Sequence, residues 1–411
     1  MNETRTPEEL GRGGLDWLLT TARQTDDGLA WPVQPSADNV DHMLYWGTPG
    51  IVVAMLEGQR HFGDDRYGDA AARGATAMAA AITDCEGSSL YTGTTGLAVT
   101  LHAVGEQLGD DEYTAAATRA LKLTRSRFDG TRWGELFELL LGNAGIALGA
   151  KYCGDLDLAV DALEPYLRTA EPTEHGVQWE HRPGAESRMH HFSHGTLGIA
   201  HALAEIGAAA NRPDFTELAL AGVADVVARD EAGPDGFLVP HSDPWDDTRQ
   251  ASRYNYGWCH GPAGDAHVFR LLRDLTGDPQ WTALADRCWH TITHSGLPRR
   301  TRPGFWDNNG RCCGTASVLA LANDRLVERD DDPAFAQVLV DDLAQRATVT
   351  DTGVCWSNVE HSADPSELEP QTGWAMGNAG IVRELLRYSR IRSGGQSGYA
   401  VGLPDQPAAR T

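Results

Sequence analysis

A short stretch with the pattern Gly-x-x-Gly recurs seven times along the chain, with one variation, and most copies are followed by an apolar run with helical spacing. The runs "LAVTLHAVGEQLG" from Leu97 and "IVRELLRYSR" from Ile381 are two examples. The first glycines of the copies are Gly47, Gly93, Gly142, Gly195, Gly261, Gly314 and Gly377. In the sixth copy, Ser317 replaces the second glycine. An apolar run that returns at intervals of 46 to 66 residues indicates a repeat architecture.

A second helix is predicted in most repeats. It follows a polar turn in which an aspartate precedes an aromatic residue, as in "GDDRYGDAA" from Gly63 and "GDPQWTALA" from Gly277. Aspartate is a favoured N-cap residue, and proline is tolerated in the first turn of a helix. Each repeat is therefore predicted to be a hairpin of two helices.

We expect an all-α protein in which seven helical-hairpin repeats close into an α/α toroid. Paired glycines would let seven helix ends approach one central site, whereas an open solenoid does not need the same small residues in every unit. The alternative is that the glycines only cap and pack the helices. Residues 1–392 are expected to form this single domain, and residues 393–411, rich in Gly, Ser and Pro, a flexible tail. The loops at residues 171–189 and 230–253 are candidates for a substrate rim.

The composition excludes several function classes. The chain has 411 residues, of which 41% are hydrophobic, but no apolar segment approaches the roughly 20 residues of a membrane span. The net charge is −24 and no dense arginine cluster is present, so nucleic-acid binding is not expected. The N-terminus shows no signal-peptide pattern, and we expect a cytoplasmic protein.

Three of the seven cysteines lie beside the first glycines of repeats five and six. They are Cys259 in "GWCHG" and the adjacent Cys312 and Cys313 in "RCCG". Because repeats place equivalent positions at equivalent heights in a ring, these thiols are predicted to converge on a zinc ion and to leave one coordination position open. The alternatives are a closed structural zinc site with His260 as fourth ligand, or three buried free cysteines.

The segments "GWCHGPAG", "CCGTAS", "HFSHGTLGIAHAL" and "ELLLGNAG" resemble the lanthionine synthetase C (LanC and LanC-like) family. The resemblance extends from Trp46 to Arg390. It implies an α/α toroid that binds one zinc ion per chain and adds a peptide cysteine thiol to dehydroalanine or dehydrobutyrine, which forms lanthionine or methyllanthionine.

The resemblance also implies the metal ligands, which would be Cys259, Cys312 and Cys313. Much of the family has Cys-His where this chain has the Cys312-Cys313 pair, although some cyclases have three cysteine ligands. His260 matches a histidine of the LanC-like branch that is not regarded as a ligand.

The acid/base histidine of the family matches His194. Many bacterial cyclases have an aspartate where this chain has Glu138, as the LanC-like branch does, so Glu138 is a second candidate catalytic residue. Some cyclases have an arginine where Asn255 stands here. Arg253 is a possible substitute, although an arginine in that loop is more typical of a solvated surface. His190 and His191, beside His194, are predicted to be rim or capping residues.

A zinc-dependent lanthionine synthetase is therefore the expected function, with a dehydrated precursor peptide as substrate. The toroid accounts for the length of the chain, so a separate dehydratase or kinase/lyase enzyme is an expected partner. Two alternatives remain open: a LanC-like protein that adds glutathione or another small thiol to dehydroamino acids, and a non-catalytic zinc-containing module that binds peptides.

Overall fold

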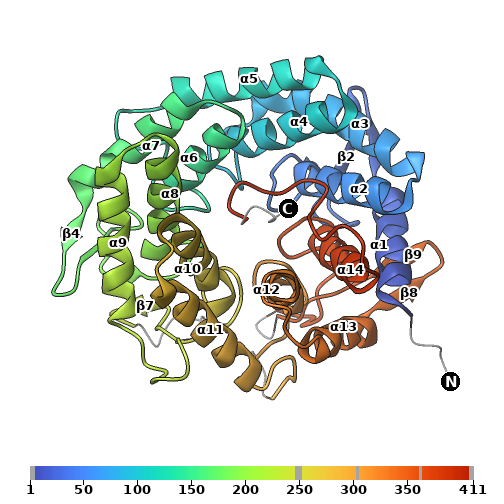
Figure 1. Cartoon of the computed structure of the whole chain (residues 1–411). Coiled ribbons are helices and arrows are strands. Elements are labelled where there is room, and N and C mark those ends of the chain that lie inside the picture. The colour runs from blue at the N-terminus through green and yellow to red at the C-terminus, as the bar shows by residue number, and fades with distance from the viewer. Residues whose placement is uncertain (1–4, 246–251, 302–304, 361–362, 407–411) are drawn as a thin grey trace.

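The computed structural model describes residues 5–245, 252–301, 305–360 and 363–406, and within them the helices form two concentric rings (Figure 1). The inner helices are α2 (Thr48–Phe62), α4 (Thr94–Leu108), α6 (Asn143–Tyr152), α8 (Thr196–Ala209), α10 (Pro262–Thr276), α12 (Thr315–Glu328) and α14 (Asn378–Arg392). The outer helices are α1 (Pro7–Thr21), α3 (Asp65–Ala80), α5 (Asp111–Ser126), α7 (Leu156–Thr169), α9 (Pro213–Val227), α11 (Pro279–His294) and α13 (Ala334–Arg346). The predicted α/α toroid is confirmed.

The ring is closed by the two ends of the chain. The last inner helix, α14, has no outer helix after it; α1, from the N-terminal end, packs against it instead, while α14 also packs on α2. Helices α1 and α14 approach closely, since a side chain at Gly11 would meet Leu386 and one at Gly14 would meet Val382. The seventh hairpin is thus assembled from opposite ends of the sequence.

Each inner helix begins one residue after a first glycine of the repeat pattern, and that glycine is its N-cap residue. The second glycine serves a different purpose, because it lets the first turn lie on the incoming loop. A Cβ at Gly145 would be 2.0 Å from the carbonyl oxygen of Leu139, and one at Gly198 would be 1.9 Å from that of Phe192. In the sixth repeat, Ser317 fits and its hydroxyl donates to the carbonyl of Gly314 at 2.7 Å.

A circle of backbone hydrogen bonds joins the seven loops that enter the inner helices. The residue two before each first glycine, which we call the ring position, donates its N–H to the carbonyl of the ring position in the next repeat, at 2.8 to 3.4 Å. The ring positions are Tyr45, Tyr91, Leu140, Ser193, Cys259, Cys312 and Ala375, and Ala375 donates back to Tyr45. The circle satisfies backbone groups that would otherwise be buried without partners.

Short antiparallel strands and one 3-10 helix stabilise the connections. The strands are β1 (Arg23–Thr25), β2 (Gly28–Pro32), β3 (Val40–Asp41), β4 (Glu171–Pro172), β5 (Val177–Gln178), β6 (Arg188–Met189), β7 (Ser242–Asp243), β8 (Thr348–Thr350) and β9 (Gly353–Cys355), and the 3-10 helix is η1 (Ala81–Asp84). The pairing of β6 with β7 joins the two loops predicted to form a substrate rim. Residues 246–251 of the second loop lie outside the described residues.

The hydrophobic core lies between the two rings, and the inner helices are buried on nearly every face. In the part of the chain that the structure describes, no helix has both the length and the apolar character needed to cross a membrane.

The segment after α14 returns to the middle of the ring (Figure 1). Val401, Leu403 and Asp405 are buried there, and Asp405 accepts a hydrogen bond from the Tyr91 hydroxyl at 2.8 Å. This placement of residues 393–406 departs from the flexible tail expected for residues 393–411. The segment is held in place from outside, because arginines of α14 donate hydrogen bonds to its backbone carbonyls. The Gly-, Ser- and Pro-rich composition of the segment itself does not predict these contacts. Residues 407–411 lie outside the described residues.

Candidate functional site

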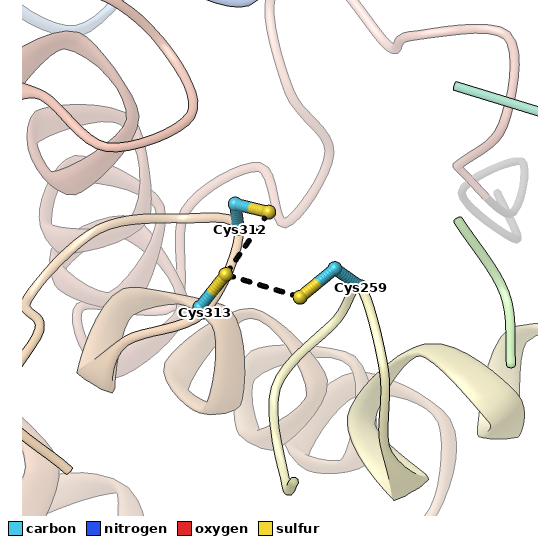
Figure 2. A group of neighbouring side chains, drawn as sticks. All are labelled: Cys259, Cys312 and Cys313. Carbon is cyan, nitrogen blue, oxygen red and sulfur yellow. Dashed lines mark hydrogen bonds between the residues drawn. The ribbon is translucent and has the colours of Figure 1, made fainter. Parts of the chain in front are cut away.

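The three predicted cysteines meet at the N-terminal ends of α10 and α12, and their side chains point toward one another (Figure 2). The sulfur of Cys313 is 3.0 Å from that of Cys259 and 3.3 Å from that of Cys312. All three are free cysteines, and their ligand atoms lie within 4.8 Å of one another. The expected convergence of repeats five and six is therefore present.

The residue directly before each first glycine, which we call the pre-glycine position, is half-buried in every repeat, whereas the ring position beside it is buried. The pre-glycine residues are Trp46, Thr92, Leu141, His194, His260, Cys313 and Met376. Partial exposure at all seven makes this face of the circle reachable from solvent. In repeats four, five and six the pre-glycine residue can bind a metal or transfer a proton: these residues are His194, His260 and Cys313.

The cysteine cluster suits a soft divalent metal. Three thiolates from two loops, with their sulfur atoms close together, form a donor set that zinc prefers. Hydrogen bonds from Cys259 and Cys313, with a further one from Tyr45, hold the pKa of Cys312 well below its usual range.

His194 and Glu138 form an ion pair on the same face. His194 Nδ1 is 3.3 Å from Glu138 Oε1, and the carboxylate also accepts the backbone N–H groups of Leu140 and Leu141. Burial alone would lower the pKa of His194, but the charge and the hydrogen bond of Glu138 outweigh it, so the pKa is raised. The negative charge of Cys312 acts in the same direction. Glu138 therefore favours the protonated form of the His194 imidazole.

His260 follows Cys259 but is not part of the metal group. Among the described residues, the group whose ligand atoms lie close enough for one ion consists of the three cysteines. The ring of His260 instead contacts two other histidines: its centroid is 5.2 Å from that of His194, with the rings nearly parallel, and 4.1 Å from that of His241.

His190 and His191 were predicted to be rim or capping residues, and the rim part is wrong; the carbonyl of His190 does accept the N–H of Leu197, in the first turn of α8. Neither is a rim residue, because both are completely buried. His191 Nδ1 is 2.8 Å from Asp265 Oδ2, on α10 of the next repeat. The sequence reasoning also missed Asp265. Its signal was a carboxylate in the first turn of α10, at a position that is apolar in the six other repeats.

The structure settles the surroundings of two further residues. Arg253 is an exposed side chain paired with Glu231 at 2.8 Å. Asn255 accepts the backbone N–H groups of Tyr256 and Gly257, and so shapes the loop that carries Cys259.

The sequence matches the family model described as "Lanthionine synthetase C-like protein" over residues 38–239 and 241–340. No curated protein matches the chain by sequence.

Solved structures with the same architecture include a nisin cyclase, with a TM-score of 0.64, 15% identity and coverage of 92% of this chain and 93% of that chain. An unsaturated glucuronyl hydrolase specific for heparin has a TM-score of 0.52, 14% identity and coverage of 94% and 98%. An inactive α-1,6-mannanase variant from Salegentibacter sp., in complex with α-1,6-mannotriose, has a TM-score of 0.51, 10% identity and coverage of 92% and 98%. At these identities the likeness shows a shared fold.

Proposed function

The chain belongs to the lanthionine synthetase C-like family, and we propose that it is a zinc-dependent cyclase that forms thioether rings in a ribosomally made peptide. The substrate would carry free cysteines together with dehydroalanine or dehydrobutyrine residues. The product would contain lanthionine or methyllanthionine.

One observation carries this proposal. Cys259, Cys312 and Cys313 cluster on the same circle of loops as the His194–Glu138 pair. His194 and Cys312 are close enough for the charge of each to shift the pKa of the other. The addition of a thiol to an alkene needs a deprotonated sulfur and then a proton at carbon, and the two groups match these needs.

Cys259, Cys312 and Cys313 would hold the zinc ion, which when bound supplies a deprotonated substrate thiol at neutral pH. With three thiolate ligands, the fourth position is left for that thiol. Three anionic protein ligands keep the sulfur electron-rich, and the half-buried Cys313 places this charge at the solvent-reachable face.

In the proposed reaction the substrate sulfur forms a bond to the β-carbon of the dehydro residue. The electron pair of the carbon–carbon double bond moves onto the α-carbon and its carbonyl, giving an enolate. The proton that the substrate thiol loses passes to solvent or to the His194 imidazole; protonated His194, stabilised by Glu138, then donates a proton to the α-carbon. No group leaves, so the mass of the peptide is unchanged.

Another activity must supply the dehydro residues, because the reaction consumes them and does not make them. A dehydratase or a kinase/lyase enzyme is the partner class that this chemistry requires.

The test is incubation of the zinc-loaded protein with a dehydrated, cysteine-containing peptide, followed by thiol alkylation and mass spectrometry. Cyclisation removes the alkylation of cysteine without any change in peptide mass. If the peptide stays alkylatable but gains the mass of glutathione when glutathione is added, the protein is the small-thiol transferase instead. If neither product forms while the peptide binds, the protein is a binding module.

A further inference from the structure

A fixed geometric relation connects neighbouring repeats. The residue four before the first glycine of one repeat lies against the pre-glycine residue of the next. A Cβ at Gly257 would be 2.9 Å from Cα of Cys313, and one at Gly310 would be 2.8 Å from Cα of Met376. Glycine at these positions leaves no side chain to touch the neighbour.

Repeats three and four carry functional side chains at this position instead of glycine. In repeat three it is Glu138, which pairs with His194 of repeat four. In repeat four it is His191, whose ring lies perpendicular to that of His260 of repeat five, with the centroids 6.1 Å apart. His191 therefore stands to His260 as Glu138 stands to His194.

His194, which pairs with Glu138, and His260, which lies against His191, are also in contact with each other. The rings of His194 and His260 stack with an interplanar angle of 20°. A change in the orientation of the His260 ring would therefore alter the packing and the orientation of the His194 ring. His191, whose ring contacts His260, is placed to control the orientation of His260.

Asp265 gives this relation its strongest support. In the six other repeats, the fourth residue after the first glycine is apolar, namely Ile51, Leu97, Ile146, Ile199, Val318 and Ile381. In repeat five it is a fully buried aspartate, paired with a fully buried histidine. A buried ionisable pair is often no more stabilising than apolar residues of similar volume, so packing alone does not explain why this repeat departs from the others.

The remaining polar atoms of the His191–Asp265 pair make no hydrogen bonds within the protein. His191 Nε2 and Asp265 Oδ1 are buried without a hydrogen-bond partner. Asp265 accepts the Nδ1–H of His191, which fixes the tautomer and the plane of the imidazole, as carboxylates do for functional histidines elsewhere.

We propose that Asp265 and His191 form a positioning pair that holds the ring of His260 against His194, and so fixes the orientation of the histidine that donates the proton. The pair does not touch the substrate and acts through His260. This inference rests on the proposed function for its effect on rate, but the placement of the rings is independent of the reaction.

The decisive variant is Asp265→Ile, which installs the residue found at this position in four other repeats. It should bind zinc as the wild type does and unfold at the same or a higher temperature, while kcat for cyclisation falls about 10–100-fold with KM little changed. Asp265→Asn, which still accepts the Nδ1–H, should retain a larger part of the rate. His201→Phe is the matched control, since it removes another buried histidine that pairs with a carboxylate, Glu205, farther along α8. It should leave the rate unchanged.

A second readout does not depend on catalysis. Selective ¹³C labelling of the 15 histidines allows the ring-proton signal of His194 to be assigned by its loss in His194→Asn. In the wild type this signal should carry the ring-current shift of the stacked His260. In Asp265→Ile the shift should change or the signal should broaden, and in His201→Phe it should not.

An unchanged His194 signal in Asp265→Ile would overturn the proposal, whatever the rate. So would a changed signal with a wild-type rate. If the wild type does not cyclise any dehydrated peptide, the proposed function fails, and the NMR comparison alone still decides whether Asp265 positions the histidines.

Discussion

The main-chain N–H of Cys259 donates to the carbonyl of Cys312 at 3.3 Å, so two of the three clustered cysteines are joined through the backbone independently of their sulfur atoms. Their loops belong to a circle of equivalent bonds that runs through all seven repeats. Removal of a sulfur therefore leaves the loops in place. Loss of metal in a cysteine variant can be separated from loss of fold.

The first prediction follows for metal binding. The wild type should contain about one zinc ion per chain, and the double variant Cys312→Ala/Cys313→Ala should contain almost none, because a single thiolate does not hold zinc. Elemental analysis after dialysis measures this, with circular dichroism to check the fold. Cys288→Ala, which removes a buried thiol of α11, is the control and should keep its zinc. Full zinc occupancy in the double variant would refute the assignment.

The second prediction concerns His194. His194→Asn should keep the fold and the zinc but lose cyclisation by about 10²–10⁴-fold, the range typical of a positioned acid or base. Asparagine matches a capping role but cannot donate a proton to the enolate. Alkylation and mass spectrometry of a dehydrated peptide give the rate. A rate near that of the wild type would remove His194 from the mechanism.

The third prediction is a shift in pH dependence. The negative charge of Glu138 contributes to the raised pKa of His194. A proton donor works in its protonated form, so activity is lost as pH rises through this pKa. Glu138→Gln removes the charge and lowers the pKa, so the alkaline limb of the kcat profile should move to lower pH. Glu205→Gln, which alters a carboxylate paired with His201, should leave the limb in place. A limb at the same pH in Glu138→Gln would show that another group sets it.

The sequence was sufficient for the features that repeat. The glycine of each copy is locally required, because any side chain at Gly198 would strike the loop before it. The shared period put Cys259 and Cys312 at one repeat position, which is why their convergence could be predicted before any coordinates. The assignment of the candidate acid/base residues His194 and Glu138 depended on the resemblance, and their pairing became visible only in the structure.

The features that were not predicted depend on contacts between distant parts of the chain. The buried His191 pairs with Asp265 of α10, and the sequence around His191 does not predict this partner, which lies 74 residues farther along the chain. The seventh hairpin takes its outer helix from the N-terminus, so its second half is missing from the sequence after α14. The tail is ordered by the side chains that surround it. A Gly- and Ser-rich composition describes the segment and not its neighbours.

The fourth prediction is a loss of stability in acid. Burial, and then the charge of Arg229, lower the pKa of His190 to about 3, so this residue is neutral in the folded state. In the unfolded chain its pKa is about 6.5, so the unfolded state binds the extra proton as pH falls from about 6.5 toward 3. Folding should weaken by about 2 kcal/mol between pH 7 and pH 5 through this residue alone.

Urea unfolding of the metal-free protein at the two pH values checks this fourth prediction. His190→Leu should lose less stability on acidification than the wild type, whereas His175→Ala, a change at an exposed loop histidine, should lose the same amount. An equal loss in His190→Leu would show that His190 is not the residue that titrates.

The fifth prediction concerns the segment that returns to the ring. Removal of residues 396–411 should lower the free energy of unfolding by about 3–5 kcal/mol, because it exposes the cavity filled by Val401 and Leu403. It also leaves Glu57 without the N–H of Ala400, which it accepts at 3.0 Å. Removal of residues 407–411 alone keeps every one of these contacts and should cost little, so it serves as the control in urea unfolding. Since the three cysteines lie on loops held by the backbone circle and not by the tail, both truncated proteins should still bind zinc. Equal stability of the two truncations would mean that the segment packs in the ring without supporting it.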